Sequence, residues 1–431
     1  MQSNKQSFSK LREIYLPGAK VSRFLAVLAF SGVAYGLYRG VLENYLAEVV
    51  RFPPFERGIV EFFRELPGFL VVFILAWMYR MSENKIFKIG LFVMALGIAG
   101  LIIAGTGKVI VVAFIVLASF GEHIILPLRS TMTLALAKKE TGGAALGVTS
   151  AIGQSGNILG YLLAALMFFL LTRIDFAGGN EVSRFKAVFL FSVALMAVSV
   201  IIALAIKESP AAIRRRRLYF AKKFRKYYML EVFYGARKQV FLTFAPYVMI
   251  LQYGASTAVI SLLFAVSAGA CAIFSPVTGR IIDRLGYKVV MVADTLLLVL
   301  VCFFYGFSHR LFSARTAYIV VCINYILDAI ISLASMASNV YVKDIAANQD
   351  EITSTLYTGV SVNHAVSIFI ALMGGWIWKV TGIEVLFSIS AFLGILNSLY
   401  AATIPSTRQC PPAPASARQR PPAPASARQR G

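Results

Sequence analysis

The chain has 431 residues, of which 58% are hydrophobic and 14% are charged. In soluble globular domains about a quarter of the residues are charged, so this composition excludes a soluble protein. A net charge of +22 would favour nucleic-acid binding in a soluble chain, but in a membrane protein it belongs on cytoplasmic loops, and we expect no nucleic-acid partner.

Apolar stretches long enough to cross a hydrocarbon layer of about 30 Å recur along the whole chain. They predict an all-α polytopic membrane protein, with twelve transmembrane helices in two six-helix halves. The expected spans are 22–46, 57–79, 86–105, 109–137, 143–171, 186–206, 237–253, 257–281, 288–307, 314–340, 353–379 and 383–404.

Lys and Arg are concentrated on alternate loops, on the side that includes the N-terminus. This bias predicts a cell (inner) membrane protein with both termini in the cytoplasm. The longest polar segment, 207–236, is expected to be a basic cytoplasmic linker whose stretch 214–226 lies on anionic lipid headgroups. The other expected parts are a cytoplasmic tail at 1–21, bundles at 22–206 and 237–404, and a disordered Pro/Ala/Arg-rich tail at 405–431.

Ionisable residues inside apolar spans are costly, so they are candidates for function and are expected to face the bundle interior. In the first two helices Arg39 lies one turn from Glu43, while Glu61, Arg64 and Glu65 lie at a similar depth. Two interpretations stay open. The charges form a substrate and proton site around Arg39, with Glu43 or Glu65 carrying the proton, or they form a fixed ion-pair network that braces the two helices.

Further candidates lie in later helices. Glu122 and His123 are adjacent, and a carboxylate beside an imidazole can exchange protons or serve helix packing. Asp328 and His364 lie at similar depth, which predicts a pair for proton coupling, with a structural polar contact as the rival. The remaining candidates for the substrate and proton pathway are Tyr35 and Tyr38 beside Arg39, Asn157 among packing glycines, Asn324 and Asn363.

The sequence shows no chemistry typical of an enzyme. The four cysteines have no metal-ligand or redox spacing. No nucleotide-binding loop, H-E-x-x-H site or nucleophile elbow is present. We therefore expect no catalytic residues, no cofactor and no metal site.

The polar turn "GRIIDRLGYK" at 279–288 resembles a signature of the major facilitator superfamily, G-x-x-x-D-R-x-G-[RK]-[RK]. The matching residues are Gly279, Asp283, Arg284, Gly286 and Lys288, whereas Tyr287 departs from the pattern. Gly279 would allow a close helix approach, and Gly286 permits a turn with positive φ. With Asp283 facing a helix N-terminus, the charged cluster is expected to form a cytoplasmic gate.

The family's other copy of this signature belongs between the second and third helices. There the chain has "AWMYRMSENK", with Ala76, Arg80 and Glu83 at the Gly, Asp and Gly positions, and only Lys85 fits. Gating is therefore expected to depend more on the turn at 279–288.

The resemblance covers about 20–404 and implies a secondary active transporter that works by alternating access, acts as a monomer and needs no cofactor. Carboxylates and histidines at depth in both halves favour coupling to protons. Arg39 and Arg64 favour a small anionic or zwitterionic organic solute. The alternatives are an exporter of drug-like amphipaths or lipids, and a non-transporting membrane sensor on the same fold.

Overall fold

The computed structural model describes residues 13–78, 80–138, 141–207 and 219–405, and in these ranges the chain forms long helices and no β-strand. The expected all-α polytopic fold is confirmed. The described residues leave out 1–12, the stretch 208–218 of the expected linker, and 406–431 of the tail expected at 405–431.

The N-terminal half consists of six long helical segments in the part of the chain that the structure describes. They are α2 (Ala19–Asn44) with its π-helical end η1 (Tyr45–Val49), α3 (Pro54–Trp77), α4 (Glu83–Ala104), α5 (Lys108–Leu136), α6 (Gly142–Arg173) and α7 (Glu181–Leu204). Local chemistry sets several starts. Ser82 and Asn180 cap α4 and α7 through their side-chain oxygens, and Pro54 begins α3 where no helical N–H is needed.

The C-terminal half begins earlier than the sequence predicts. Its first long helix starts at Arg225 rather than at 237, so part of the expected linker is helical. The elements are η2 (Lys222–Phe224), α8 (Arg225–Tyr253), α9 (Thr257–Leu285), α10 (Tyr287–Leu311), α11 (Ala314–Ile331), η3 (Ser332–Ser335), α12 (Met336–Ile345), α13 (Gln349–Thr381) and α14 (Ile383–Ala402). The segment from α11 to α12 is one continuous span, Ala314–Ile345.

Ten of these helical spans are long and apolar enough to cross a membrane. The two long helices outside that set are α3 and α8, which carry several charged residues each. Most of those charges within the helices are buried, and the two helices hydrogen-bond to each other. The charged residues of α3 and α8 therefore mostly face the interior of the protein and not water.

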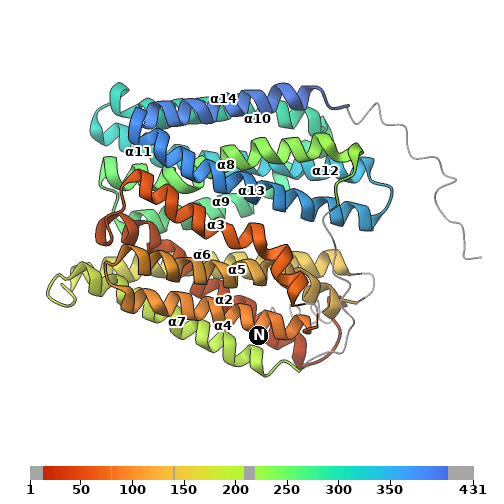
Figure 1. The fold of residues 1–431 in the computed structure, drawn as a ribbon, viewed down its shortest axis with the longest axis horizontal. Helices are drawn as coiled ribbons and strands as arrows, with labels where there is room; N and C mark the ends of the chain where they lie inside the picture. Colours follow the sequence, from red (N-terminus) through yellow and green to blue (C-terminus); the bar gives the residue numbers. More distant parts are fainter. Residues whose placement is uncertain (1–12, 79, 139–140, 208–218, 406–431) are drawn as a thin grey trace, which may run out of the picture.

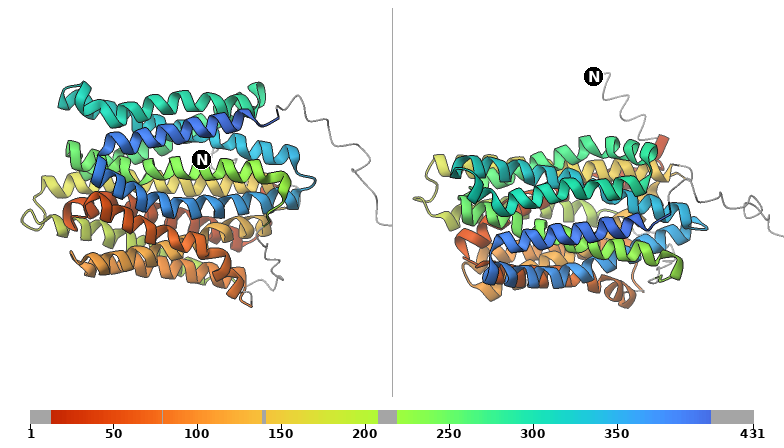
Figure 2. Two further views of the ribbon diagram at one scale, coloured as in Figure 1. Left: turned by 45° about the horizontal axis from the view of Figure 1, so that its top comes forward. Right: turned by 90° about the horizontal axis from the view of Figure 1, so that it is seen from above.

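The two halves lie side by side, with the N-terminal half below and the C-terminal half above in Figure 1. The helices run roughly parallel to one another in all three views (Figures 1 and 2). Within the N-terminal half, α2 and α6 cross closely: a Cβ on Gly36 would lie 2.3 Å from the carbonyl oxygen of Asn157. The glycines around Asn157 thus serve helix packing, as the sequence predicts.

The halves meet at the end where α2 stops and α3 begins. The Tyr247 hydroxyl donates to the carbonyl of Phe52 at 2.6 Å. The Ser261 hydroxyl donates to the carbonyl of Gly40 at 2.7 Å. All the hydrogen bonds that join described residues of the two halves lie either at this end or at mid-depth.

Glycines bring α3 and α13 into contact at the same end. A Cβ on Gly58 would lie 2.4 Å from the carbonyl oxygen of Ala371, and a Cβ on Gly375 would lie 2.8 Å from that of Pro54. Contacts this short leave no room for any side chain. The two backbones therefore seal this end of the interface between the halves.

At the opposite end, the described part of the linker is attached to the start of α13 through Glu351. Its carboxylate accepts hydrogen bonds from Lys223 at 2.6 Å, from Tyr219 at 2.8 Å and from the backbone N–H of Ala347 at 2.7 Å. Glu351 lies outside the membrane-spanning part of α13. Partial burial raises the pKa of Glu351, but these hydrogen bonds outweigh it and hold the pKa below its usual value.

Replacing Glu351 with Gln is expected to loosen this attachment. Hydrogen exchange at the Ala347 amide, followed by mass spectrometry, should accelerate about fivefold, because a charge-assisted hydrogen bond is lost. A carboxyl group whose pKa is depressed on folding stabilises the fold above its unfolded pKa, and this contribution disappears as the pH falls through the folded pKa. Acidification should therefore reproduce the effect in the wild type but not in the variant. Glu83→Gln at the start of α4 is the control.

Candidate functional site

The central group of the site is Glu61 on α3, which is fully buried. Arg64 binds it from one side through two hydrogen bonds of 2.6 and 2.9 Å, and Arg57 binds it from the other at 2.9 Å. Residues three and four apart share one face of a helix, so the sequence of α3 itself places these three charges together. Arg64 also pairs with the neighbouring Glu65.

The network continues onto α2. Arg57 donates two hydrogen bonds of 3.0 Å to the two oxygens of Glu43, in the bidentate geometry typical of strong pairs. Arg39 lies 3.8 Å from Glu43, and its Nη1 is buried without a hydrogen-bond partner among the described residues. Arg39 is therefore the guanidinium with spare donor capacity in this cluster.

Two contacts extend the network to the C-terminal half. Gln239 on α8 donates to Glu61 at 3.0 Å, and His364 on α13 hydrogen-bonds through Nδ1 to Glu65 at 2.7 Å. Both contacts join residues that lie far apart in the sequence. The site therefore lies at the interface between the halves, inward of the closed end.

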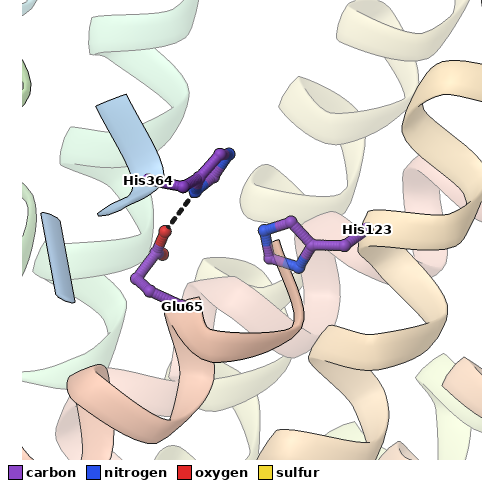
Figure 3. Close-up of side chains that lie close together, drawn as sticks. All are labelled: Glu65, His123 and His364. Atoms are coloured by element: carbon purple, nitrogen blue, oxygen red, sulfur yellow. Dashed lines mark hydrogen bonds and ion pairs between the residues drawn. The ribbon is translucent and has the colours of Figure 1, made fainter. Parts of the chain in front are cut away.

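His123 on α5 lies beside this interface. Its Nδ1 is 2.8 Å from the carbonyl oxygen of Ser119, which can only accept, so Nδ1 carries the hydrogen and Nε2 is left with a free lone pair. Figure 3 shows both imidazole rings and the carboxylate of Glu65 turned toward a common space. One ligand atom each of Glu65, His123 and His364 lies within 4.8 Å of the others.

Gly68 gives the two imidazole rings room to approach each other, because it has no side chain. A Cβ at this position would lie 2.6 Å from Nε2 of His123 and 3.0 Å from Nδ1 of His364. The two rings consequently approach with their centroids 5.0 Å apart. The sequence gives no signal for this role, because Gly68 and the two histidines lie in three different helices.

Glu122, next to His123, faces a different partner. It accepts a hydrogen bond of 2.6 Å from the Tyr35 hydroxyl on α2, whereas His123 bonds to Ser119. The expected exchange between the neighbouring Glu122 and His123 therefore has no direct contact to use, because consecutive residues on a helix point in different directions. Tyr38 is buried against Phe189 and forms part of the core.

A second charged cluster lies within the C-terminal half. Arg237 on α8 hydrogen-bonds to Asp294 on α10 at 3.1 Å and lies 3.8 Å from Asp328 on α11. Nη2 of Arg237 and Oδ1 of Asp328 are buried and have no hydrogen-bond partner among the described residues. The Arg237–Asp328 contact is thus a loose pair between two buried groups.

These contacts correct the expected pairing of Asp328 with His364. His364 points across the interface to Glu65, and Asp328 points to Arg237 inside its own half. Equal depth along two helices does not decide which faces meet. Asn324, one turn before Asp328, is buried and donates to the carbonyl of Val320 at 2.9 Å.

The remaining polar candidates have structural partners. Asn363 lies 3.4 Å from both Glu231 and Lys238, and the Ser338 hydroxyl donates to Glu231 at 3.2 Å. Glu231 and Arg237 both line a cavity of about 20 Å³, which is enough for one water molecule. Asn157 is half-buried, and its side chain bonds to Gln154 on the same helix.

The expected cytoplasmic gate is only partly visible. Gly286 has a φ of +82°, as its role in a tight turn requires. Asp283 and Arg284 are exposed and form no ion pair with another described residue. No atom lies within 4 Å of a Cβ placed on Gly279, so the expected close approach of a neighbouring helix is absent. The described hydrogen bonds between the halves lie at the opposite end of the interface and at mid-depth, so none of them reaches Asp283 or Arg284.

Three residues of the site are not predicted from the sequence. Arg57 was expected at the outer boundary, and Arg237 and Gln239 were expected at the edge of a span, yet all three are at least 97% buried. The expected spans begin at 57 and 237 because a hydropathy pattern places the end of a span at a charged residue. The available signal was spacing, because Arg57 lies four residues before Glu61 on the same face.

Comparison with known proteins agrees with this architecture. Residues 227–430 match the family model described as Major Facilitator Superfamily, and residues 2–211 match the model described as PUCC protein. No curated protein matches the sequence.

Solved transporter structures share the fold at low sequence identity. The nucleoside transporter NupG is 14% identical with a TM-score of 0.69, over 89% of this chain and 98% of that one. A D-xylose-proton symporter is 16% identical with a TM-score of 0.70, over 90% and 98%. A POT family transporter in complex with 5-aminolevulinic acid is 12% identical with a TM-score of 0.68, over 88% and 94%.

Two helical halves that meet at buried ion pairs, with ten spans long and apolar enough to cross a membrane among the described residues, define a multi-pass membrane protein. Residues 227–430 match the major facilitator superfamily, and about nine-tenths of the chain has the fold of these solved transporters.

Proposed function

We propose that the chain is a proton-coupled secondary transporter that moves a small organic solute by alternating access. The observation that carries the proposal is the position of the charged network. It lies at mid-depth between the halves, directly inward of the end that is closed by Gly58, Tyr247 and Ser261. A solute bound there would be shielded from one side of the membrane.

The distribution of Lys and Arg supports an orientation with both termini in the cytoplasm of the cell and with the closed end outside. Arg57 and Arg237 are buried, so Arg57 no longer counts with the outer loops and Arg237 no longer counts with the cytoplasmic linker. Each side loses one positive charge, and the excess on the cytoplasmic side remains. In this orientation the conformation is closed to the outside. In the alternative conformation, which is open to the outside, the charged residues of the turn at 279–288 would form ion pairs and close the cytoplasmic end.

The Arg39 guanidinium is the best candidate for contact with the solute. It is buried, and its Nη1 has no hydrogen-bond partner among the described residues. These features support a solute with an anionic or zwitterionic group. The structural neighbours are described as transporters of nucleosides, D-xylose and peptides, so these three classes begin the panel of test solutes.

Asp328 is the best candidate for the coupled proton. A buried carboxylate that has an unpartnered oxygen and only a 3.8 Å contact to Arg237 is costly to keep charged. Protonation of Asp328 would remove its attraction for Arg237, which would then pair with Asp294 alone. Such a change in pairing within one half is suited to linking proton binding to movement of the helices.

Asp328→Asn is expected to separate solute movement from proton movement. In proteoliposomes that contain the pH dye pyranine, a transported solute should change the internal pH in the wild type. In the variant, exchange of labelled solute should persist while the pH change falls at least about tenfold, since the proton-binding group is gone. Asp175→Asn at an exposed pair serves as control. Unchanged proton movement in the Asp328 variant would contradict its role, and no movement of any solute by folded protein would contradict transport.

A further inference from the structure

Three side chains at the interface of the halves combine the ligand atoms that divalent transition metals prefer. Glu65 on α3 and His123 on α5 come from the N-terminal half, and His364 on α13 comes from the other half. Two imidazoles with one carboxylate suit ions such as Zn²⁺, Co²⁺ and Fe²⁺. We propose that Glu65, His123 and His364 form a binding site for a divalent transition-metal ion.

The distances are close to those that coordination requires. The three ligand atoms lie within 4.8 Å of one another. Ligands bound to one ion at about 2.1 Å in tetrahedral geometry lie about 3.4 Å apart. Small rotations of the two imidazole rings, which already face the same space in Figure 3, supply the difference. Gly68 leaves that space free of a Cβ.

Hydrogen bonds to neighbouring residues already orient the side chains that would bind the ion. The hydrogen bond from Nδ1 of His123 to the Ser119 carbonyl fixes the ring in the tautomer whose Nε2 can bind a metal. Arg64 holds one oxygen of Glu65 and leaves the other, Oε2, for the site. The ion takes the place of the hydrogen between His364 Nδ1 and Glu65 Oε2, and the neutral ring then carries its single hydrogen on Nε2.

The local charge also favours a cation. The residues of the N-terminal half around the site include more carboxylates than guanidiniums: Glu43, Glu61, Glu65 and Glu122 against Arg39, Arg57 and Arg64. A bound cation supplies positive charge beside Glu65. Three protein ligands leave coordination positions open, which is typical of an exchangeable ion and not of a closed structural site.

The position of the site gives the ion a mechanical consequence. Because His364 is on the opposite half from its two partners, a bound ion connects the halves and stabilises the closed conformation. Binding that is specific to the folded state raises the melting temperature with ion concentration. The inference does not depend on which organic solute is carried.

The test uses the full chain, purified without a polyhistidine tag and stripped with a chelator. Equilibrium binding of Zn²⁺ and the visible absorption of Co²⁺ are measured for the wild type and for His123→Gln, His364→Gln and Glu65→Gln. We expect one tight ion per chain, and binding at least tenfold weaker in each variant, about the loss expected for a perturbed metal site. His309→Gln is a matched control, since His309 lies near the end of α10 beside Glu384.

His364→Cys guards against an effect of misfolding. It retains a ligand, so Co²⁺ should bind and show a new sulfur-to-metal charge-transfer band. The proposal is overturned if the wild type binds no ion, if His309→Gln abolishes binding while the other histidine variants retain it, or if Co²⁺ binds the Cys variant without that band. None of these results would bear on solute transport by the wild type, so the two proposals fail separately.

Discussion

Replacement of Glu61 by Gln is expected to lower the free energy of unfolding by about 3–5 kcal/mol. Glu61 is fully buried between Arg57 and Arg64 and also accepts from Gln239. The substitution keeps the size of the side chain but leaves one buried positive charge without compensation. Unfolding in increasing SDS, or a thermal melt in detergent, measures the loss.

The control is Glu56→Gln, five residues earlier on the same helix. Glu56 pairs with Lys108, but both side chains are more than one-third exposed, and exposed pairs contribute about 0–1 kcal/mol. A double-mutant cycle with Arg64→Gln should show strong coupling to Glu61, with a double variant less destabilised than the sum of the single ones. Similar small losses at Glu56 and Glu61 would mean that the network is hydrated and contributes little.

This network shows how far the sequence could lead. Spacing along α2 and α3 predicted that Arg39 lies one turn from Glu43 and that Arg64 lies at the depth of Glu61 and Glu65. In the structure these neighbours form ion pairs. These are contacts within one helix, whose geometry is fixed by the period of 3.6 residues. Ten of the helical spans follow for a similar reason, because a long apolar segment can cross a bilayer.

Contacts between the halves could not be predicted in this way. Glu65 and His364 are 299 residues apart, and only the packing of α3 against α13 brings them together. The sequence suggested Asp328 as the partner of His364 because the two lie at equal depth, but depth gives no information about helix rotation. The glycine at position 68 likewise has a meaning only once three helices are in place.

The same packing of α3 against α13 provides the most direct means of disturbing the conformation. Gly58→Ala is expected to open the closed end of the interface. A Cβ there would lie 2.4 Å from the carbonyl oxygen of Ala371, which belongs to the backbone and cannot rotate away. Helix propensity acts in the opposite direction, because Ala favours a helix interior over Gly by about 1 kcal/mol. If the closed end opens in the Gly58→Ala variant, the cause is the steric clash between the halves and not a loss of helix stability.

Ser261 offers a measure of that opening, since it is fully buried and bonds across the interface to Gly40. With the native cysteines removed and Ser261→Cys introduced, a water-soluble maleimide should react at least about tenfold faster in the Gly58→Ala background, a shift of about 1.4 kcal/mol. Gly269→Ala is the matched control, because it adds the same Cβ to a helix of the opposite half where no atom lies within 4 Å. Equal labelling in the two backgrounds would show that the seal between α3 and α13 yields without separating the halves, and alternating access would then need another closing contact.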